Sequence, residues 1–346
     1  MRAFDLRMKI IITTPAPPRS RYGNRVTALR WANILKELGH HVAISQAYQD
    51  GNYDLMIALH ARRSYRSVKR FHTLHPNNPL IVALSGTDLY RELNQSKQAR
   101  ESLELATRIV VLQPKAFDDL PPHLHPKTRV IYQSAQRIRQ SRQPDSLINT
   151  HNFRVCVIGH LRPVKDPFRA ALAVRRLPPT SRIRVLHIGG AMSDEMEKRA
   201  RAEMEINPRY RWLGEQPRWR TLRILTQSHL CVLSSRMEGG ANTLSESISV
   251  SVPVIASRIP GTVGILGEDY PGLFTVGDTQ ELRRLLIRAE AEPDFLRLLR
   301  SRSAELSDII EPSREQGAWK NLLGELKGSG QSVKSSKKDS KESHSG

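Results

Sequence analysis

Two glutamates flank a glycine pair in the stretch SSRMEGGANTLSE. Glu238 directly precedes Gly239 and Gly240, and Glu246 follows on a helix predicted to begin near Ala241. A glycine loop that leads into a helix N-terminus presents backbone N–H groups and the positive end of the helix dipole, and this combination binds diphosphates. A carboxylate accepts two hydrogen bonds at once, so Glu238 suits the hydroxyls of a sugar and Glu246 suits a ribose diol.

The predicted anion site therefore comprises the loop and the first residues of the helix. Its members are Gly239, Gly240, Ala241, Asn242 and Thr243. The alternative interpretation is structural: the glycines form an ordinary turn, and Glu246 is a solvated acid that interacts favourably with the helix dipole.

A second set of charged residues follows another predicted strand. The run FRVCVIG ends at Gly159, His160 comes next, and Arg162 and Lys165 lie in the loop before the following helix. Two cations at the carboxyl end of a strand can neutralise a leaving diphosphate and stabilise negative charge as it develops. In so arginine-rich a chain, a solvated basic loop is the alternative.

The first half of the chain has basic residues in a comparable position. The segment TPAPPRSRYGNR places Arg19, Arg21 and Arg25 around a predicted turn at Gly23 and Asn24, between the first strand and its helix. Arginine binds phosphate-like anions through a planar set of donors. We therefore expect this loop to contact an anionic substrate.

Polar residues also follow the next two apolar runs of this half. His60 and Arg62 come from the segment LHARRS, and Thr87 and Asp88 come from SGTDLY. Because ligands of open α/β sheets bind beyond the carboxyl ends of the strands, we assign all four to an acceptor site. Two structural alternatives are open: His60 as a satisfied buried histidine, and Asp88 as the cap of a helix that starts near Leu89.

The elements that position these residues alternate between short apolar runs and segments of helical period, which predicts βαβ units and parallel sheets. The predicted strands lie near 8–14, 41–46, 53–59, 79–85, 108–112, 128–132, 153–159, 182–189, 210–213, 230–235, 252–256 and 271–276. The predicted helices are 25–38, 166–176, 193–206, 217–228, 241–250, 279–291, 293–310 and 313–326. The buried face of the first helix is predicted to carry Val26, Leu29, Ala32, Leu35 and Leu38.

The fold class that follows is α/β, with two Rossmann-like, doubly wound domains of parallel strands that face each other across a cleft. Residues 1–140 form the predicted N-terminal acceptor domain, and the polar stretch 141–152 is the linker to a C-terminal domain at 153–312. A helix at 313–327 is expected to pack back on the N-terminal domain. The Ser- and Lys-rich tail, 328–346, buries too little apolar surface to fold.

Composition limits the partners and the compartment. The 346 residues carry 54 Lys and Arg against 34 Asp and Glu, a formal net charge of +20, which favours an anionic partner. The two cysteines, Cys156 and Cys231, lie within apolar runs, which predicts buried thiols and a reducing, cytoplasmic setting. The apolar run near the start is far too short to span a bilayer, so we expect no secretion signal and no stable membrane insertion.

Several common kinds of site have no counterpart in the sequence. It has no zinc-type spacing of Cys and His, no Walker loop and no GxSxG motif. The arginines lack interleaved aromatic residues, which argues against nucleic acid as a partner. We therefore expect a reaction that needs neither a metal nor a cofactor.

The two glutamates with seven residues between them, the Lys165 loop and the segment PVIASRIPG resemble the EX7E glycosyltransferases of the GT4 type, which have the GT-B fold. The resemblance covers the whole second domain. It implies that Glu238 approaches the sugar of a nucleotide diphosphate sugar, that Glu246 holds the ribose and that a basic pair binds the diphosphate. Lys165 and Arg162 take the positions of that pair, although the family usually has its arginine where this chain has His160.

A longer resemblance runs nearly from end to end through TPAPPRSRYGNRVTALRWA, ALSGTDLYREL, VIGHLRPVKDPFRAALA, SSRMEGGAN and GEDYPGLFTVGD. In these segments the chain is similar to the selenosugar synthases of selenoneine biosynthesis. The resemblance implies an enzyme that joins selenophosphate to the anomeric carbon of UDP-N-acetylglucosamine or UDP-glucose, forming a carbon–selenium bond and releasing UDP and phosphate. It also implies a selenophosphate synthetase as supplier and a selenoneine synthase as the next enzyme.

Two other functions are open on the sequence alone. The first is a GT4 glycosyltransferase that acts on a lipid or another small-molecule acceptor, with the positive charge serving attachment to anionic lipid. An exposed apolar and basic helix in the first domain would favour it. The second is a non-catalytic binder of anions or nucleic acid, whose binding would depend steeply on salt and survive loss of both glutamates.

Overall fold

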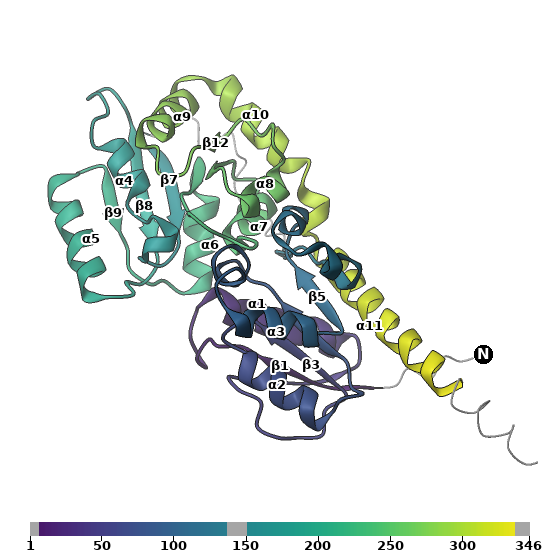
Figure 1. The fold of residues 1–346 in the computed structure, drawn as a ribbon. Helices are drawn as coiled ribbons and strands as arrows, with labels where there is room; N and C mark the ends of the chain where they lie inside the picture. The colour runs from purple at the N-terminus through teal and green to yellow at the C-terminus, as the bar shows by residue number, and fades with distance from the viewer. Residues whose placement is uncertain (1–6, 137–150, 336–346) are drawn as a thin grey trace, which may run out of the picture. The chain divides into compact units, whose positions relative to one another are not determined.

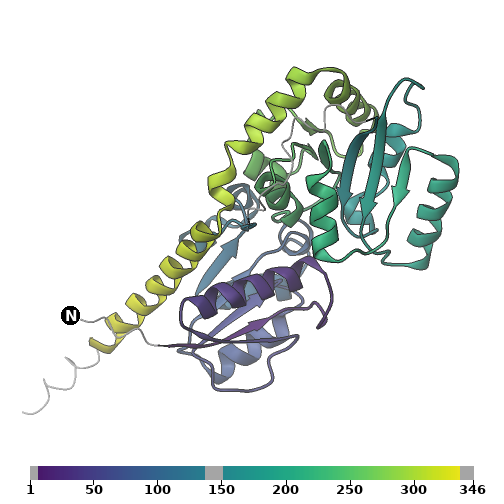
Figure 2. The same ribbon diagram turned by 180° about the vertical axis from the view of Figure 1, so that it is seen from behind.

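The computed structural model describes residues 7–136 and 151–335, which form two compact units drawn in Figures 1 and 2. Unit 1 consists of the described parts of Met1–Val111, Leu120–Ile131 and Ser313–Gly346. Unit 2 consists of the described parts of Leu112–Asp119 and Tyr132–Pro312. The predicted linker lies outside the described residues, except for its last two positions.

Unit 1 is built on a six-stranded sheet in which all neighbouring strands are parallel. In spatial order the strands are β2 (His41–Ser45), β1 (Lys9–Thr13), β3 (Leu55–Leu59), β4 (Leu80–Ala83), β5 (Arg108–Val111) and β6 (Thr128–Val130). Each of them lies within a predicted strand. The central strands β3 and β4 are buried along their whole length, which explains their unbroken apolar sequences.

The helices of unit 1 include α1 (Gly23–Glu37), α2 (Tyr65–Leu74) and α3 (Lys97–Leu105), with a π-helical turn at Asp88–Glu92 and a 3-10 turn at Pro122–Lys127. The predicted buried face of α1 was wrong at Leu29, which is 45% exposed. Trp31 is fully buried and lies at the centre of the packed face. Because two residues advance about 200° around a helix, Leu29 faces solvent on the opposite side.

The last described helix, α11 (Pro312–Ser335), packs on unit 1 and runs beside β5 (Figures 1 and 2). Trp319 meets Trp31 edge to face, with ring centroids 4.9 Å apart. The buried carboxylate of Glu315 accepts a 2.7 Å hydrogen bond from the Trp31 indole. Glu325 accepts hydrogen bonds from Arg108 and Arg129. The helix thereby contributes both apolar and ionic contacts to unit 1.

The helix α11 also extends to Ser335, into the region predicted as a disordered tail from 328. Once a helix is nucleated by packed turns, each further residue adds a hydrogen bond at little extra ordering cost, so it can continue past the last apolar residue. Residues 336–346 lie outside the described part of the chain.

Unit 2 repeats the parallel arrangement with a second six-stranded sheet. Its strands in spatial order are β12 (Leu273–Phe274), β11 (Val254–Ser257), β10 (Leu230–Leu233), β7 (Phe153–Ile158), β8 (Ile183–Ile188) and β9 (Tyr210–Trp212). Cys156 and Cys231 face each other in the β7–β10 register, and both are fully buried free thiols, as predicted. Burial raises the pKa of the Cys231 thiol to about 12.

The helices of unit 2 are α4 (Arg169–Val174), α5 (Asp194–Ile206), α6 (Arg218–Thr226), α7 (Asn242–Ser249), α8 (Pro260–Leu266), α9 (Thr279–Ala291) and α10 (Pro293–Ala304). There are also 3-10 turns at Pro114–Asp119, Pro163–Lys165 and Ser307–Ile310. The sequence did not predict α8. The single helix predicted at 293–310 is instead α10 followed by a separate 3-10 turn.

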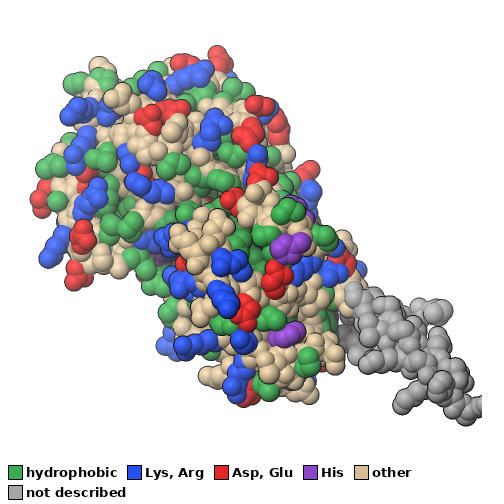
Figure 3. Space-filling model, viewed as in Figure 1, with side chains coloured by type: hydrophobic (Ala, Val, Ile, Leu, Met, Phe, Trp, Pro, Cys, Tyr) green, Lys and Arg blue, Asp and Glu red, His purple; other side chains and the backbone are tan. Residues whose placement is uncertain are grey.

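Lys and Arg side chains are spread over the face drawn in Figure 3, interspersed with Asp and Glu. They do not gather there into a single basic patch. Of the helices that the structure describes, none has the length and apolar content to cross a bilayer.

Candidate active site

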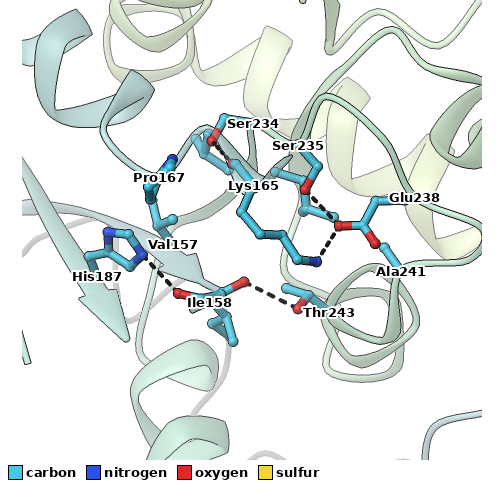
Figure 4. A pocket seen from close by; sticks show the side chains of 13 residues that line it. Val157, Ile158, Lys165, Pro167, His187, Ser234, Ser235, Glu238, Ala241 and Thr243 are labelled. Atoms are coloured by element: carbon cyan, nitrogen blue, oxygen red, sulfur yellow. Dashed lines mark hydrogen bonds and ion pairs between the residues drawn. The ribbon is translucent and has the colours of Figure 1, made fainter. Parts of the chain in front are cut away.

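The carboxyl edge of the unit 2 sheet holds an ion pair between Lys165 and Glu238 (Figure 4). The Glu238 side chain is 11% exposed and the Lys165 side chain 23%. Ser235 Oγ donates a 2.7 Å hydrogen bond to the same carboxylate oxygen that Lys165 contacts, Oε1. The other oxygen, Oε2, has no hydrogen bond among the described residues, so it is available to a ligand.

Two loops are fastened together to bring these side chains into contact. Ser234 Oγ donates to the Asp166 carbonyl at 2.9 Å, and the Arg236 backbone N–H donates to the Val164 carbonyl at 2.8 Å. Asp166 has a left-handed backbone, with φ of 43°, which ends the short turn that carries Lys165. The loop after β7 and the loop after β10 therefore form one rigid edge around a pocket.

The pocket is lined by residues from β7, β8 and β10 and from the first turn of α7 (Figure 4). Ala241 and Thr243 line it, and Thr243 Oγ1 donates to the Ile158 carbonyl at 3.4 Å. Gly239 is buried and Gly240 half-buried in the loop before α7, and Asn242 is the first residue of that helix. The predicted glycine loop thus does lead into a helix at the pocket.

The helix α8, which the sequence did not predict, packs against the loop that carries Glu238. A Cβ atom at Gly261 would lie 2.0 Å from the Glu238 carbonyl oxygen, so only glycine permits this approach. Gly261 belongs to the PVIASRIPG segment, whose Pro-Gly pair marks the start of α8. The sequence signal for α8 was therefore present in this segment. In the structure, its glycine allows α8 to pack closely against the loop of Glu238.

Glu246 lies on α7, outside the lining of this pocket. Its side chain is 13% exposed and forms an ion pair with Arg218, with 2.5 Å between Arg218 Nη1 and Glu246 Oε1. Arg218 begins α6 and its side chain is 60% exposed. The sequence reading missed Arg218 because the two residues are far apart in the chain.

Of the site residues predicted in the loop after β7, only some line the pocket. Gly159 lines the pocket with Lys165, whereas Arg162 is exposed and His160 is half-buried, and neither lines it. The structure adds His187 from β8, a fully buried residue that lines the pocket and that the sequence reading missed. Burial lowers the pKa of His187 to about 4. The available signal was a histidine next to the carboxyl end of β8, whose other polar residue, Arg184, lies near its start.

Comparison with known proteins agrees with this geometry. Residues 138–305 match the model of the family described as Glycosyl transferases group 1. Most of unit 2, including the Lys165–Glu238 pair, falls within the match. The chain is a glycosyltransferase.

Proteins similar to this glycosyltransferase align with most of its length. A curated relative from Xenopus tropicalis, glycosyltransferase 1 domain-containing protein 1, is 24% identical over 302 residues, which are 81% of this chain and 87% of the relative. A solved structure of Anabaena HepE with UDP and glucose aligns with a TM-score of 0.73 at 16% identity, covering 92% of this chain and all of HepE. Sucrose-phosphate synthase from Thermosynechococcus elongatus aligns with a TM-score of 0.73 at 15% identity, covering 93% of this chain and 99% of the synthase. These likenesses confirm the predicted α/β class and the GT-B fold.

The carboxyl edge of the unit 1 sheet in the glycosyltransferase is also polar and buried. His60 is 2% exposed and has a left-handed backbone, with φ of 75°, which is strained for a residue other than glycine. Its Nε2 lies 3.3 Å from Thr87 Oγ1 and 3.7 Å from Glu92 Oε2. His60 and Thr87 thus come together as predicted, with Glu92 as an additional member.

Arg62 is held by Glu92 through two hydrogen bonds, of 2.7 and 3.1 Å. Burial raises the pKa of the Glu92 carboxyl, but the Arg62 hydrogen bonds and the charges of His60 and Arg62 outweigh this effect, so the net pKa falls below its usual value. The Glu92 hydrogen bond raises the pKa of Arg62. The donors of Arg62 that face Glu92 are therefore occupied.

Asp88 is fully buried and is not the cap of an α-helix. It begins the π-helical turn, and its carboxylate accepts from the backbone N–H groups of Ala61 at 3.0 Å and Ser85 at 2.9 Å. It therefore joins the loops after β3 and β4. Because both of its oxygens are used on the backbone, the geometry supports a structural role.

The loop after β1 differs from its prediction at Gly23 and Asn24. These residues form the first turn of α1 instead of a separate turn, because the Arg25 N–H already donates to the Tyr22 carbonyl at 2.8 Å. Arg19 and Arg21 are exposed, and Arg25 is half-buried. Over the described residues, no group of three or more His, Cys, Asp or Glu side chains is placed to hold a metal ion.

Proposed function

We propose that this glycosyltransferase transfers a sugar from a UDP-sugar, UDP-N-acetylglucosamine or UDP-glucose, to the selenium atom of selenophosphate. The observation that carries the proposal is the Lys165–Glu238 pair in the pocket at the edge of unit 2. The solved HepE structures with UDP and UDP-glucose support the donor class, because their fold is the same. The sequence resemblance to selenosugar synthases supports the acceptor.

On the donor side, Lys165 would bind the diphosphate as it leaves. An ammonium group is a compact charge that can be shared between two anions, so Lys165 can contact the diphosphate without breaking fully from Glu238. Oε2 of Glu238 would accept from a sugar hydroxyl. Glu246 would bind the ribose hydroxyls, for which Arg218 must yield one carboxylate oxygen. Arg162, exposed on the same loop, would reach the outer phosphate.

On the acceptor side, unit 1 offers arginines that are not already neutralised. The side chains of Arg19 and Arg25 have no hydrogen bond or ion pair among the described residues. Arg62, by contrast, is bound to Glu92. Free guanidinium groups would bind the phosphate oxygens of a small, highly charged acceptor, which a hydrophobic acceptor would not require.

The reaction balances without an oxidant or reductant. A selenium lone pair forms the bond to the anomeric carbon while the bond from that carbon to the diphosphate oxygen breaks, and UDP leaves with the electron pair. Water then cleaves the selenium–phosphorus bond, which releases phosphate and a selenosugar. Because selenophosphate is already an anionic nucleophile, the attack needs little help from a general base such as His60.

The test is mass spectrometry of the purified protein with UDP-N-acetylglucosamine or UDP-glucose, with and without selenophosphate generated in place under anaerobic, reducing conditions. The proposal expects a product with a selenium isotope pattern on a hexose-type mass, and UDP release that depends on selenophosphate. Lys165→Ala should form product about a thousandfold more slowly, while Arg220→Ala, a change at an exposed arginine of α6, should form it as fast as wild type. UDP release without selenium in the product would reject selenophosphate as acceptor.

The proposal includes a setting for the reaction. A selenophosphate synthetase would supply the acceptor and a selenoneine synthase would consume the product, in the reducing cytoplasm that selenophosphate requires. Transfer would proceed without a metal or other cofactor. Activity that disappears with a chelator and returns with a divalent ion would overturn this last part.

One observation favours a second acceptor class. Tyr22 and Leu29, at 38% and 45% exposed, lie on or next to the first turns of α1, close in the chain to the basic residues Arg21 and Arg25. Such an apolar and basic helix surface fits the alternative of a lipid acceptor. Co-sedimentation with anionic liposomes tests it: strong binding that Leu29→Glu abolishes would support a lipid acceptor, and no binding would reject it.

A further inference from the structure

The ring of His187 is fully buried and uses both nitrogens. Nε2 lies 3.0 Å from the Gly159 carbonyl oxygen, and Nδ1 lies 3.0 Å from the Tyr210 hydroxyl. A carbonyl oxygen can only accept, so Nε2 must carry a proton and donate it. In the neutral ring Nδ1 then accepts from the Tyr210 hydroxyl, which fixes a single tautomer.

The neutral form is the one that this environment favours. Burial lowers the pKa of His187 to about 4 and raises that of Tyr210, since neither charged form is solvated there. At neutral pH the chain from Tyr210 through His187 to Gly159 is therefore uncharged and constant. A network in one fixed protonation state can hold a position and does not exchange protons.

The position that it holds is the end of β7. The Gly159 N–H donates to the Ile188 carbonyl at 2.8 Å, while its carbonyl accepts from His187, so β8 grips the same residue by backbone and by side chain. Gly189 closes the arrangement: its φ is 151°, and a Cβ atom there would lie 2.0 Å from the Gly159 oxygen. Little freedom remains at this point of the loop.

The stem of Lys165 passes near Gly159. A Cβ atom added at this glycine would come into van der Waals contact with the stem, 3.8 Å from Lys165 Cδ, and both residues line the pocket with His187 and Glu238 (Figure 4). A shift of Gly159 would displace the surface over which Lys165 extends toward Glu238.

We infer that His187 is a positioning residue for donor binding, which fixes Gly159 so that the loop presents Lys165 to the donor diphosphate. The inference rests on the proposed function, because it takes Lys165 to be the diphosphate ligand. In this role His187 acts through Gly159 and the loop that follows.

The experiment compares His187→Phe, which keeps a ring but removes both hydrogen bonds, with His187→Gln, which keeps a donor near the position of Nε2. UDP affinity is measured by calorimetry, and donor KM and kcat by UDP release. We expect His187→Phe to weaken UDP binding and raise donor KM about tenfold with a smaller change in kcat, and His187→Gln to recover most of the loss.

His229, the residue before β10 at the amino end of the same sheet, provides a matched control. It is also buried, its Nδ1 accepts from the Arg154 N–H at 2.9 Å and it stacks on Phe153, at the end of the sheet away from the pocket. His229→Phe should cost comparable stability, read from the unfolding midpoint, and leave UDP affinity unchanged. Equal loss of UDP affinity in both Phe variants, or in neither, would overturn the inference.

Nitrogen NMR of the wild-type ring covers the case in which His187→Phe fails to fold. The inference requires the neutral Nε2–H tautomer at pH 7 with UDP and without it, and a protonated ring or the other tautomer would reject it. The UDP affinity of the wild-type protein distinguishes a failure of the proposed function from a failure of this inference. Absence of UDP binding by wild type would count against the proposed function. The inference is tested by the ratio of UDP affinities between the variants and wild type.

Discussion

The carboxyl edges of the two sheets both bring a cation from one loop to a buried glutamate from another, but the two pairs differ in what they leave available. In unit 1, Glu92 spends both carboxylate oxygens on the fork of Arg62. In unit 2, Glu238 uses Oε1 for Lys165 and Ser235 and keeps Oε2 without a partner among the described residues. A bidentate guanidinium pair fixes two loops, whereas an ammonium on one oxygen leaves capacity for a ligand. We call the first edge, where both oxygens of Glu92 are bound by Arg62, the closed edge, and the second, where Oε2 of Glu238 keeps its capacity for a ligand, the open edge.

The largest effect should come from the Lys165–Glu238 pair at the open edge. Lys165→Ala removes the charge that would neutralise the leaving diphosphate, so we expect kcat/KM to fall about a thousandfold, or about 4 kcal/mol. Steady-state UDP release measures this. Arg162→Ala, on the same loop but exposed, is the matched control and should lose less than about tenfold. A Lys165→Ala enzyme within tenfold of wild type would remove the distinction between the two edges.

The next effect concerns stability and arises from His187 at the open edge. Its pKa of about 4 in the folded protein lies below the usual 6.5, so the unfolded chain takes up a proton first as pH falls. This contribution to stability is complete above about pH 6.5 and is lost between 6.5 and 4, on the order of 3 kcal/mol. Denaturant unfolding of wild type and His187→Gln at pH 7.5 and pH 4.5 isolates it, because the other groups titrate in both proteins. A difference in the free energy of unfolding that is independent of pH would contradict the expectation.

Glu246 should give a smaller effect, confined to donor binding. Glu246→Ala is expected to raise donor KM about tenfold to thirtyfold, about 1.5 to 2 kcal/mol, with kcat changed less, because ribose contacts are made in both ground and transition states. Arg218→Ala leaves the carboxylate free for the ribose and should change donor KM less than about threefold. Loss of kcat with unaltered KM in Glu246→Ala would assign this residue to the transferred sugar.

The smallest expected effects distinguish the roles of Arg62 and Arg25, two arginines of the closed edge. Arg62→Ala should lower the free energy of unfolding by about 1 kcal/mol, discounted because Arg62 is 41% exposed, and leave acceptor KM almost unchanged. Arg25→Ala should raise the KM for selenophosphate about threefold to tenfold with little change in stability. Unfolding by heat or denaturant measures the stability of both variants, and acceptor kinetics measure their KM for selenophosphate. The reverse pattern would mean that Arg62, despite Glu92, serves the acceptor.

The difference between the edges also explains what the sequence could predict. Strands were found because buried parallel strands are unbroken apolar runs, and the glycine loop that leads from Glu238 into α7 was found because its residues are consecutive in the chain. Glu92 and His187 were missed because their roles depend on residues about thirty positions away in sequence, Arg62 and Gly159. The helix α8 was missed because it is only seven residues long and begins with Pro-Gly. Local signals therefore predicted the strands and the glycine loop, whereas contacts between residues distant in sequence decide which charged groups are paired.

The docking of α11 on unit 1 has a consequence for how the chain is made. Trp319 and Leu322 are core residues of a unit whose first strand begins at Lys9, and all of unit 2 is encoded between them. During synthesis from the N-terminus, unit 2 can therefore complete its core while unit 1 still exposes the surface around Trp31 that Trp319 will cover. A chain that ends after residue 312 would have a complete second unit and an incomplete first unit. Such a chain would be a natural substrate for chaperones that bind exposed apolar surface.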